Sequence, residues 1–284
     1  MNIQEHSTPG GRTRKARSFK DAHIVFLEPR MGSEMGGLIQ RYGGQPACVP
    51  AVREVSLGRE QQVAAFIDNL RQGHLRVLIF MTGVGVVALF REAEQLGRLS
   101  ELLDLLRKAI IVCRGPKPVA VLKRYGVSVL LRAEEPYTTD DLLTTLMLLD
   151  LKGKGIAVVH HGERNARLAQ ALQERDVRLE ELCLYEWHLP EDITPLQTLV
   201  RAIIAQQVDA VVFTSQIQVR HLLVIARELK LAHELIRALN TRTVVASIGP
   251  TCSEALHHCG VTPHVVPEHP KMGHLIKTLA MYMA

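Results

Sequence analysis

The chain has 284 residues, enough for about two globular domains, and its 47% hydrophobic and 22% charged residues are typical of globular proteins. Aromatic residues make up 4%, too few for a nucleic-acid surface built on stacked bases. Most of the net charge of +5 lies in residues 1–20, where five Lys and Arg residues stand against Glu5. We therefore expect a disordered basic tail over 1–21, solvated or used by a partner, and no nucleic-acid ligand for the rest.

Cysteine spacing and apolar run length indicate the compartment. The five cysteines show no CxxC spacing, which favours reduced residues in a cytosolic protein. The longest apolar run, VLIFMTGVGVVALF, has 14 residues and is too short to span a bilayer. The first residues do not form a signal peptide pattern. We expect a soluble cytoplasmic protein with no membrane partner.

Short β-branched runs alternate with segments of helical periodicity along the whole chain. In chain order the predicted strands are 23–28, 76–82, 109–113, 127–131, 155–161, 179–187, 210–215, 242–248 and 263–266. Segments 59–73 and 166–176 show the 3.6-residue period of amphipathic helices. Apolar strands separated by helices indicate parallel sheets covered on both faces. The predicted fold class is α/β.

The second half of the chain repeats features of the first half. Gly115, Gly126 and Pro136 each recur 134 residues later, as Gly249, Gly260 and Pro270. Segment 24–46 aligns with 156–178, and Thr82 aligns with Thr214, both at an offset of 132. An ordered run of offsets predicts an internal duplication with two similar parallel-sheet lobes. Clefts between two lobes are favoured ligand sites.

Four strand-to-helix junctions carry glycine or hydroxyl residues at matching places in the two copies. Ligands of open α/β sheets bind beyond the carboxyl ends of strands, where helix N-termini offer N–H groups. Each junction alone could equally be an ordinary helix cap or tight turn. Four at repeated positions favour a shared anion-binding surface. The junctions are 81–85, 113–117, 213–216 and 247–251.

The sequence gives little evidence for nucleotide binding, metal binding or nucleophilic catalysis. Segment 82–88 fits a dinucleotide fingerprint, but the acidic residue expected about 20 positions on is absent, and the second copy has no glycine there. The pairs His160-His161 and His257-His258 lack the spacing that sets two rings on one helix face, so we expect surface or capping histidines. The sequence contains no nucleophile elbow or Walker loop. We expect no metal and no cofactor.

Four elements in this order resemble the uroporphyrinogen-III synthase family. They are IVFLEPRMGSEMGGLIQRYGG, LIFMTGVGVVALF, FTSQIQVRHLL and ASIGPTCSEALHHCGVTPHVVPEHP, and the resemblance covers about residues 22–282. Two features depart from the family pattern. Gly83 replaces a usual serine in a loop that is one residue shorter, and Lys117-Pro118 occupies a loop that often bears a hydroxyl.

The resemblance implies a domain arrangement as well as a fold. The first strand and helix would belong with the C-terminal part, so that 22–50 and 190–284 form one lobe and 53–186 the other. A two-stranded linker would join the lobes. The segments ACVPAVREV and ELCLYEW would be its crossing strands.

The resemblance also implies a reaction, the cyclisation of hydroxymethylbilane to uroporphyrinogen III with loss of water and inversion of the last ring. Tyr185 would donate a proton to the departing hydroxyl, although a tyrosine on an apolar strand could equally be a packing residue. The alternative function is a non-catalytic tetrapyrrole- or anion-binding regulatory module on the same fold. We expect a monomer that binds its substrate through Thr82, Gly83, Lys117, Thr214, Ser215, Thr251 and Arg30.

Overall fold

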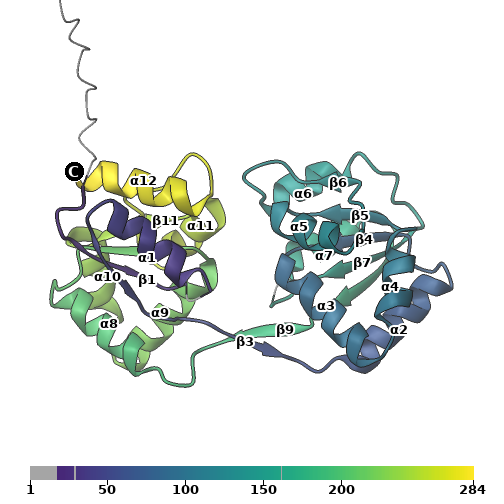
Figure 1. Cartoon of the computed structure of the whole chain (residues 1–284), viewed down its shortest axis with the longest axis horizontal. Coiled ribbons are helices and arrows are strands. Elements are labelled where there is room, and N and C mark those ends of the chain that lie inside the picture. Colours follow the sequence, from purple (N-terminus) through teal and green to yellow (C-terminus); the bar gives the residue numbers. More distant parts are fainter. Residues whose placement is uncertain (1–17, 29, 161) are drawn as a thin grey trace, which may run out of the picture.

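Two parallel β-sheets form the framework of the computed structural model, which describes residues 18–28, 30–160 and 162–284. Figure 1 shows the sheets in two lobes that lie side by side and are joined by a ribbon of two strands. The α/β prediction is confirmed. Within the described part of the chain, no helix is long and apolar enough to cross a membrane.

Lobe 1 is built on a four-stranded sheet in the order β11-β10-β1-β2. Its strands are β1 (His23–Phe26), β2 (Gln45–Cys48), β10 (Ala210–Phe213) and β11 (Val244–Ser247). One face packs against α1 (Gly32–Arg41) and α12 (Met272–Met283). The other packs against α8 (Thr194–Ile204), α9 (Gln216–Glu228), α10 (Ala232–Thr241) and α11 (Pro250–His258).

Lobe 2 is built on a five-stranded sheet in the order β6-β5-β4-β7-β8. Its strands are β4 (Val77–Phe80), β5 (Ile110–Cys113), β6 (Leu131–Arg132), β7 (Gly155–Val159) and β8 (Arg178–Leu182). One face is covered by α2 (Glu60–Arg71), α3 (Gly83–Gln95), α4 (Leu99–Leu106) and α5 (Pro116–Arg124). The other is covered by α6 (Thr139–Leu146) and α7 (Ala166–Gln173).

Both sheets are apolar on both faces because helices cover both. In β1, Ile24 and Phe26 pack towards α1 and α12, whereas Val25 packs towards the opposite helix layer. Successive side chains of a strand point to opposite faces, so a continuous apolar run is what a doubly covered strand requires. This explains why the strands read as unbroken apolar runs and not as alternating ones.

The ribbon consists of β3 (Arg53–Ser56) and β9 (Tyr185–His188), which pair antiparallel with Ser56 opposite Tyr185. The expected crossing strands 47–55 and 181–187 are each divided in the structure. The first part of each belongs to a lobe sheet, as β2 or β8, and only the second part belongs to the ribbon. Pro50 lies between β2 and β3, and the Ala51 N–H beyond it still donates to the Leu27 carbonyl at 3.4 Å.

The two sheets have the same strand order, as the internal repeat predicts. Val112 of β5 pairs with Leu131, and the residues 134 positions later, Ala246 and Val265, form the equivalent bridge. In lobe 1 this pairing is a single bridge, so the predicted strand 263–266 is wrong. Prolines at 263 and 267 flank the bridge, and each removes a backbone donor that a longer ladder would need.

The division into 22–50 with 190–284 and into 53–186 stays a proposal, supported by the sheet order. β1, which precedes Arg30, lies in the same sheet as β11, which precedes Thr251. Most of the expected basic tail, residues 1–17, lies outside the described residues. Phe19 is only 2% exposed and its N–H donates to the Tyr42 carbonyl at 2.6 Å. The tail boundary expected at residue 21 is therefore wrong, because Phe19 already belongs to the core.

Candidate functional site

The α3 N-terminus is formed by the threonine and glycines of the first predicted loop. Thr82 is the N-cap of α3, and its Oγ1 accepts a hydrogen bond from the Gly85 N–H at 3.0 Å. A Cβ on Gly85 would lie 3.1 Å from the His160 carbonyl oxygen, so a larger residue would push α3 away from the end of β7. The loop therefore needs a small residue here for close packing.

Tyr185 lies directly behind this cap. Its hydroxyl is 3.0 Å from Thr82 Oγ1, and either oxygen can be the donor. The side chain is 0% exposed, and its ring packs edge-on against Trp187 with centroids 5.1 Å apart. Burial raises the pKa of Tyr185 to about 12, against smaller opposing effects of the Thr82 hydrogen bond and of nearby arginines. Tyr185 is therefore a protonated phenol at neutral pH.

Trp187 packs against Tyr185 and lies between Gly162 of lobe 2 and Arg30 of lobe 1. A Cβ on Gly162 would lie 2.3 Å from Trp187 Cδ1, so the indole lies flush against the Gly162 backbone. The Arg30 guanidinium lies 5.2 Å from the indole centroid, a cation–π distance. Arg30 also contacts Glu28 at 3.4 Å and Glu54 at 3.6 Å. Arg30 thus joins lobe 1 to the ribbon, and its charge is already partnered.

The substitution of glycine for serine at position 83 has a packing reason. A Cβ on Gly83 would lie 3.1 Å from the Lys117 carbonyl oxygen, so the first turns of α3 and α5 touch at this point. The structure thereby brings Thr82, Gly83 and Lys117 together in lobe 2. The Lys117 side chain itself is exposed.

The equivalent loop of lobe 1 is organised by a buried glutamine. Gln218 is 1% exposed, and its Oε1 accepts from the Thr214 N–H at 2.8 Å. Its Nε2 donates to Thr214 Oγ1 at 3.0 Å. Ser215 is the N-cap of α9. Thr251 is exposed in the first turn of α11, which packs beside α9. Lobe 1 therefore gathers Thr214, Ser215 and Thr251 near one another.

Polar contacts at two places connect the lobes near these loops. Arg220 of α9 pairs with Glu163 at 2.9 Å, and Gln216 donates to the same carboxylate at 3.1 Å. His269 Nδ1 lies 2.9 Å from Glu135 Oε1. Among the described residues, no hydrogen bond joins Thr82 directly to Thr214. The loops are therefore connected through neighbouring residues, and the sequence does not signal these long-range pairs or the role of Trp187.

His160 corrects the expectation of a surface histidine. It is 0% exposed, its Nε2 lies 2.9 Å from Glu181 Oε1, and its Nδ1 accepts from the Asn165 N–H at 3.2 Å. Burial, the largest effect, lowers the pKa of His160. His161 lies outside the described residues, whereas His257 and His258 are exposed. Over residues 18–28, 30–160 and 162–284, no three His, Cys, Asp or Glu residues are grouped for metal binding.

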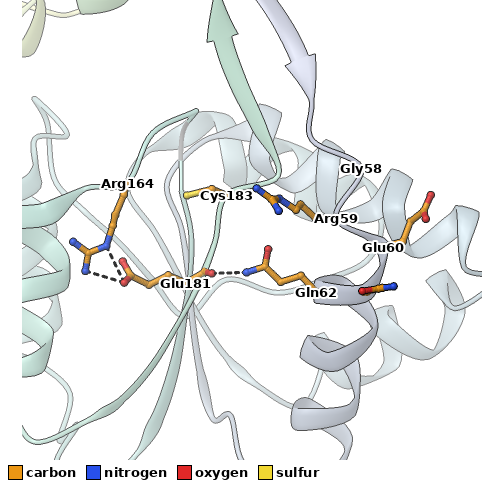
Figure 2. A pocket seen from close by; sticks show the side chains of 8 residues that line it. Gly58, Arg59, Glu60, Gln62, Arg164, Glu181 and Cys183 are labelled. Atoms are coloured by element: carbon orange, nitrogen blue, oxygen red, sulfur yellow. Dashed lines mark hydrogen bonds and ion pairs between the residues drawn. The ribbon is translucent and has the colours of Figure 1, made fainter.

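An open pocket of about 620 Å³ lies at the edge of lobe 2 and contains none of the expected site residues. Figure 2 shows Arg59, Glu181 and Arg164 around it, with Glu181 bonded to Arg164. A second pocket, of about 970 Å³, lies beside β2 and α8 in lobe 1. Both are separate from the Thr82–Tyr185 pair, which is covered by Trp187 in this structure.

Comparisons with known proteins extend over both lobes. The sequence matches the family model described as Uroporphyrinogen-III synthase HemD over residues 33–277. It is 32% identical to the uncharacterized protein YjjA of Bacillus subtilis (strain 168). The alignment spans 253 residues, which are 89% of this chain and 93% of that protein. The fold is similar to a mutant uroporphyrinogen III synthase from Thermus thermophilus, with a TM-score of 0.71 and 27% identity over 92% of this chain and 98% of that one. The wild-type Thermus protein in another crystal form gives a TM-score of 0.54 at 29% identity, over the same shares of both chains.

Proposed function

The chain belongs to the uroporphyrinogen-III synthase family, and from this premise we propose that it closes hydroxymethylbilane to uroporphyrinogen III. In this reaction the linear tetrapyrrole loses water and its last ring is inverted. The observation that carries the proposal is the hydrogen bond between Tyr185 and Thr82 at the carboxyl end of β4. It supports the proposal because ligands of α/β sheets bind beyond the carboxyl ends of strands.

Tyr185 serves this reaction as a proton donor. The leaving hydroxyl departs by electron push from its own pyrrole, so no nucleophile is required and one positioned acid suffices. A pKa of about 12 keeps the phenol protonated until it meets the departing oxygen. The Thr82 hydroxyl, fixed as a helix cap, orients the phenol and can return a hydrogen bond to it. A positioned acid of this kind contributes roughly 10²–10⁴-fold to a rate.

The loops of both lobes bind the substrate. The Thr82-Gly83 and Lys117 loops of lobe 2 and the Thr214-Ser215 and Thr251 loops of lobe 1 end strands and begin helices. Their N–H and hydroxyl groups suit the acetate and propionate groups of the substrate. Holding the two chain ends together is the main task, because the ring that inverts is chosen by geometry.

Access to Tyr185 requires movement. Trp187 and Arg30 cover the phenol in this structure, and Tyr185 is 0% exposed. The cover is held from lobe 1 by Arg30 and from lobe 2 by Gly162. Separation of the lobes would withdraw Arg30 from the indole and open the route. The proposed cycle therefore includes opening for binding and release.

The same covering favours the second candidate function, a non-catalytic tetrapyrrole- or anion-binding module. A tyrosine sealed beneath Trp187 is also what a packing residue looks like, and Arg30 already has carboxylate partners. Such a protein would bind the tetrapyrrole at the loops and leave it unchanged.

Incubation with freshly prepared hydroxymethylbilane, followed by chromatographic separation of the product isomers, tests the proposal. The expected result is uroporphyrinogen III in excess over the isomers formed in buffer alone. An isomer pattern equal to that of buffer, with tetrapyrrole bound, would establish the binding module instead. The monomeric state, the cytoplasmic location and the lack of a nucleic-acid partner belong to this proposal, and gel filtration of the pure protein checks the first of them.

A further inference from the structure

Arg114 lies between the two loops of lobe 2 and has no part in the steps above. It follows β5 directly, and its backbone N–H donates to the Phe80 carbonyl at 3.0 Å, at the end of β4. The next residue, Gly115, is the N-cap of α5, and the Lys117 carbonyl of that helix touches Gly83. Arg114 therefore emerges beside the Thr82-Gly83 loop.

The Arg114 guanidinium is a partly buried cation without an anionic partner. Over the described ranges 18–28, 30–160 and 162–284, no carboxylate oxygen lies within 4.0 Å of it and no acceptor bonds to it. Partly buried arginines are usually paired with carboxylates. Arg98 is an example, because it pairs with Asp68 and Glu101 at 2.8 Å each. An arginine stays charged in a protein, so partial burial without a partner costs free energy.

Burial and the neighbouring Tyr185 also indicate an anion site at Arg114. Burial, the largest effect, lowers the pKa of the Arg114 guanidinium, and Tyr185 is the ionisable group near enough to affect that pKa. In the reverse direction, Arg114 is one of the cations that act on Tyr185. An anion bound at Arg114 would therefore lie near the phenol that the proposed reaction uses.

The first turn of α5 has few backbone N–H groups that could bind an anion. Two of its first three residues, Pro116 and Pro118, have no N–H, so this helix end is poor in donors. In the equivalent helix α11, Pro250 is followed by Thr251, which adds a hydroxyl, and by Cys252, whose N–H already donates to the Gly249 carbonyl at 3.1 Å. The residue equivalent to Arg114, 134 positions later, is Ile248. The two copies thus differ in their side chains: the second copy offers the Thr251 hydroxyl, and the first copy offers the Arg114 charge.

We propose that Arg114 binds a carboxylate of the ligand beside Tyr185, at a helix end where Pro116 and Pro118 offer no N–H. The proposal rests on the proposed function for the identity of that carboxylate, an acetate or propionate of the tetrapyrrole. The planar guanidinium can hold both carboxylate oxygens at once.

Binding of two probes to Arg114→Gln tests the proposal. Uroporphyrin III, the unreactive oxidised form of the product, is followed by quenching of the single Trp187, and benzenehexacarboxylate by calorimetry. We expect dissociation constants about tenfold to a hundredfold higher than in the wild type. The matched control is Arg124→Gln, which removes the same charge from an exposed position at the far end of α5 and is expected to bind as the wild type does.

A structural role for Arg114 makes a different prediction. Removing an unpartnered, partly buried charge should leave the melting temperature of Arg114→Gln unchanged or raise it, whereas removing a structural arginine lowers it. If the melting temperature falls, Arg114→Lys decides: affinity above that of Arg114→Gln supports the proposal, because the charge is restored without the planar group, and affinity equal to that of Arg114→Gln overturns it. Equal affinity of Arg114→Gln and wild type for both probes overturns it in every case.

The two probes separate this proposal from the proposed function. Arg114-dependent binding of benzenehexacarboxylate, together with no binding or turnover of tetrapyrroles, would keep the carboxylate site and overturn the synthase. Wild-type formation of uroporphyrinogen III with no effect of Arg114→Gln on affinity or on KM would keep the synthase and overturn the site.

Discussion

Glu135 and His269 occupy equivalent positions in the two copies of the internal repeat and meet each other, with Glu135 Oε1 2.9 Å from His269 Nδ1. They are 134 residues apart, the offset that also relates Gly115 to Gly249, and each precedes a proline. Equivalent loops of the two lobes therefore face each other. A ligand held between the lobes would touch matching elements on both sides, which suits a molecule that carries carboxylates on every ring.

The ion pair between Glu163 and Arg220 is expected to favour the closed arrangement of the lobes. Both side chains are partly exposed, so the pair contributes about 0–1 kcal/mol, and Glu163→Gln should shift the open-to-closed ratio by at most about fivefold. Small-angle X-ray scattering should show a larger radius of gyration for this variant. Glu94→Gln changes the same charge on an exposed part of α3 and is the control. Identical scattering of both variants would mean that the pair does not hold the lobes.

Tyr185→Phe keeps the ring packed against Trp187 and removes only the hydroxyl. If Tyr185 is the proton donor, turnover of hydroxymethylbilane should fall tenfold or more while the melting temperature changes little. Tyr125→Phe, at an exposed tyrosine on the other side of α3, is the matched control and should keep full turnover. Unchanged turnover of Tyr185→Phe would leave the tyrosine as a packing residue, and positioning alone would have to explain the rate.

Gly162→Ala should disturb the cover over Tyr185. Its φ of +74° strains any alanine by about 1–2 kcal/mol, and the added Cβ would also lie 2.3 Å from Trp187. Gly153→Ala is the control, because its φ is +68° and a Cβ there meets nothing within 4 Å. Both variants should lose stability in a thermal melt, and only Gly162→Ala should change the Trp187 emission spectrum. Equal spectra would contradict the close contact.

The buried His160 should make stability depend on pH. Burial lowers the pKa of His160 below its ordinary value of 6.5, so the unfolded chain takes up the proton first. Stability from this residue is complete above about pH 6.5 and is lost as the pH falls from there towards the lowered pKa, at no more than about 1.4 kcal/mol per pH unit. Chemical denaturation between pH 7.5 and 5.5 should give a flatter slope for His160→Gln than for the wild type.

The control for this titration is His257→Gln, which removes an exposed histidine of α11. It should keep the pH slope of the wild type, because the substitution leaves the buried His160 in place. If His160→Gln and His257→Gln have the same slope, His160 is not held neutral by burial.

The fold was predictable where the pattern is local or repeated. The offset of 134 relates the pair Val112–Leu131 to Ala246–Val265, so one copy predicts the strand order of the other. Strand boundaries at 47–55 and 179–187 were not predictable, because an apolar run shows that a strand is buried but not which sheet it joins. The prolines around Val265 were visible in the sequence and could have warned against a strand there.

Single residues of the candidate site were predictable from the sequence, but the contacts between them were not. Thr82 and Tyr185 are each expected from the sequence, but their hydrogen bond joins residues 103 positions apart and depends on how the ribbon enters lobe 2. The cover formed by Trp187, Gly162 and Arg30 has no local signal, because it arises where three separate segments converge. Gln218 had a weak signal, since a glutamine three residues after an N-cap often reaches back over the first turn.

The pairing of β1 with β10 has a consequence for how the protein is made. His23 and Asp209, which bond at the start of these strands, are 186 residues apart, and all of lobe 2 is synthesised between them. The five strands of lobe 2 can pair as soon as β8 has left the ribosome, whereas β1 and β2 must wait with an apolar edge exposed until β10 follows. Lobe 2 should therefore fold first during translation, and a chain stopped before β10 should carry a finished lobe 2 beside an unpaired, aggregation-prone segment of lobe 1.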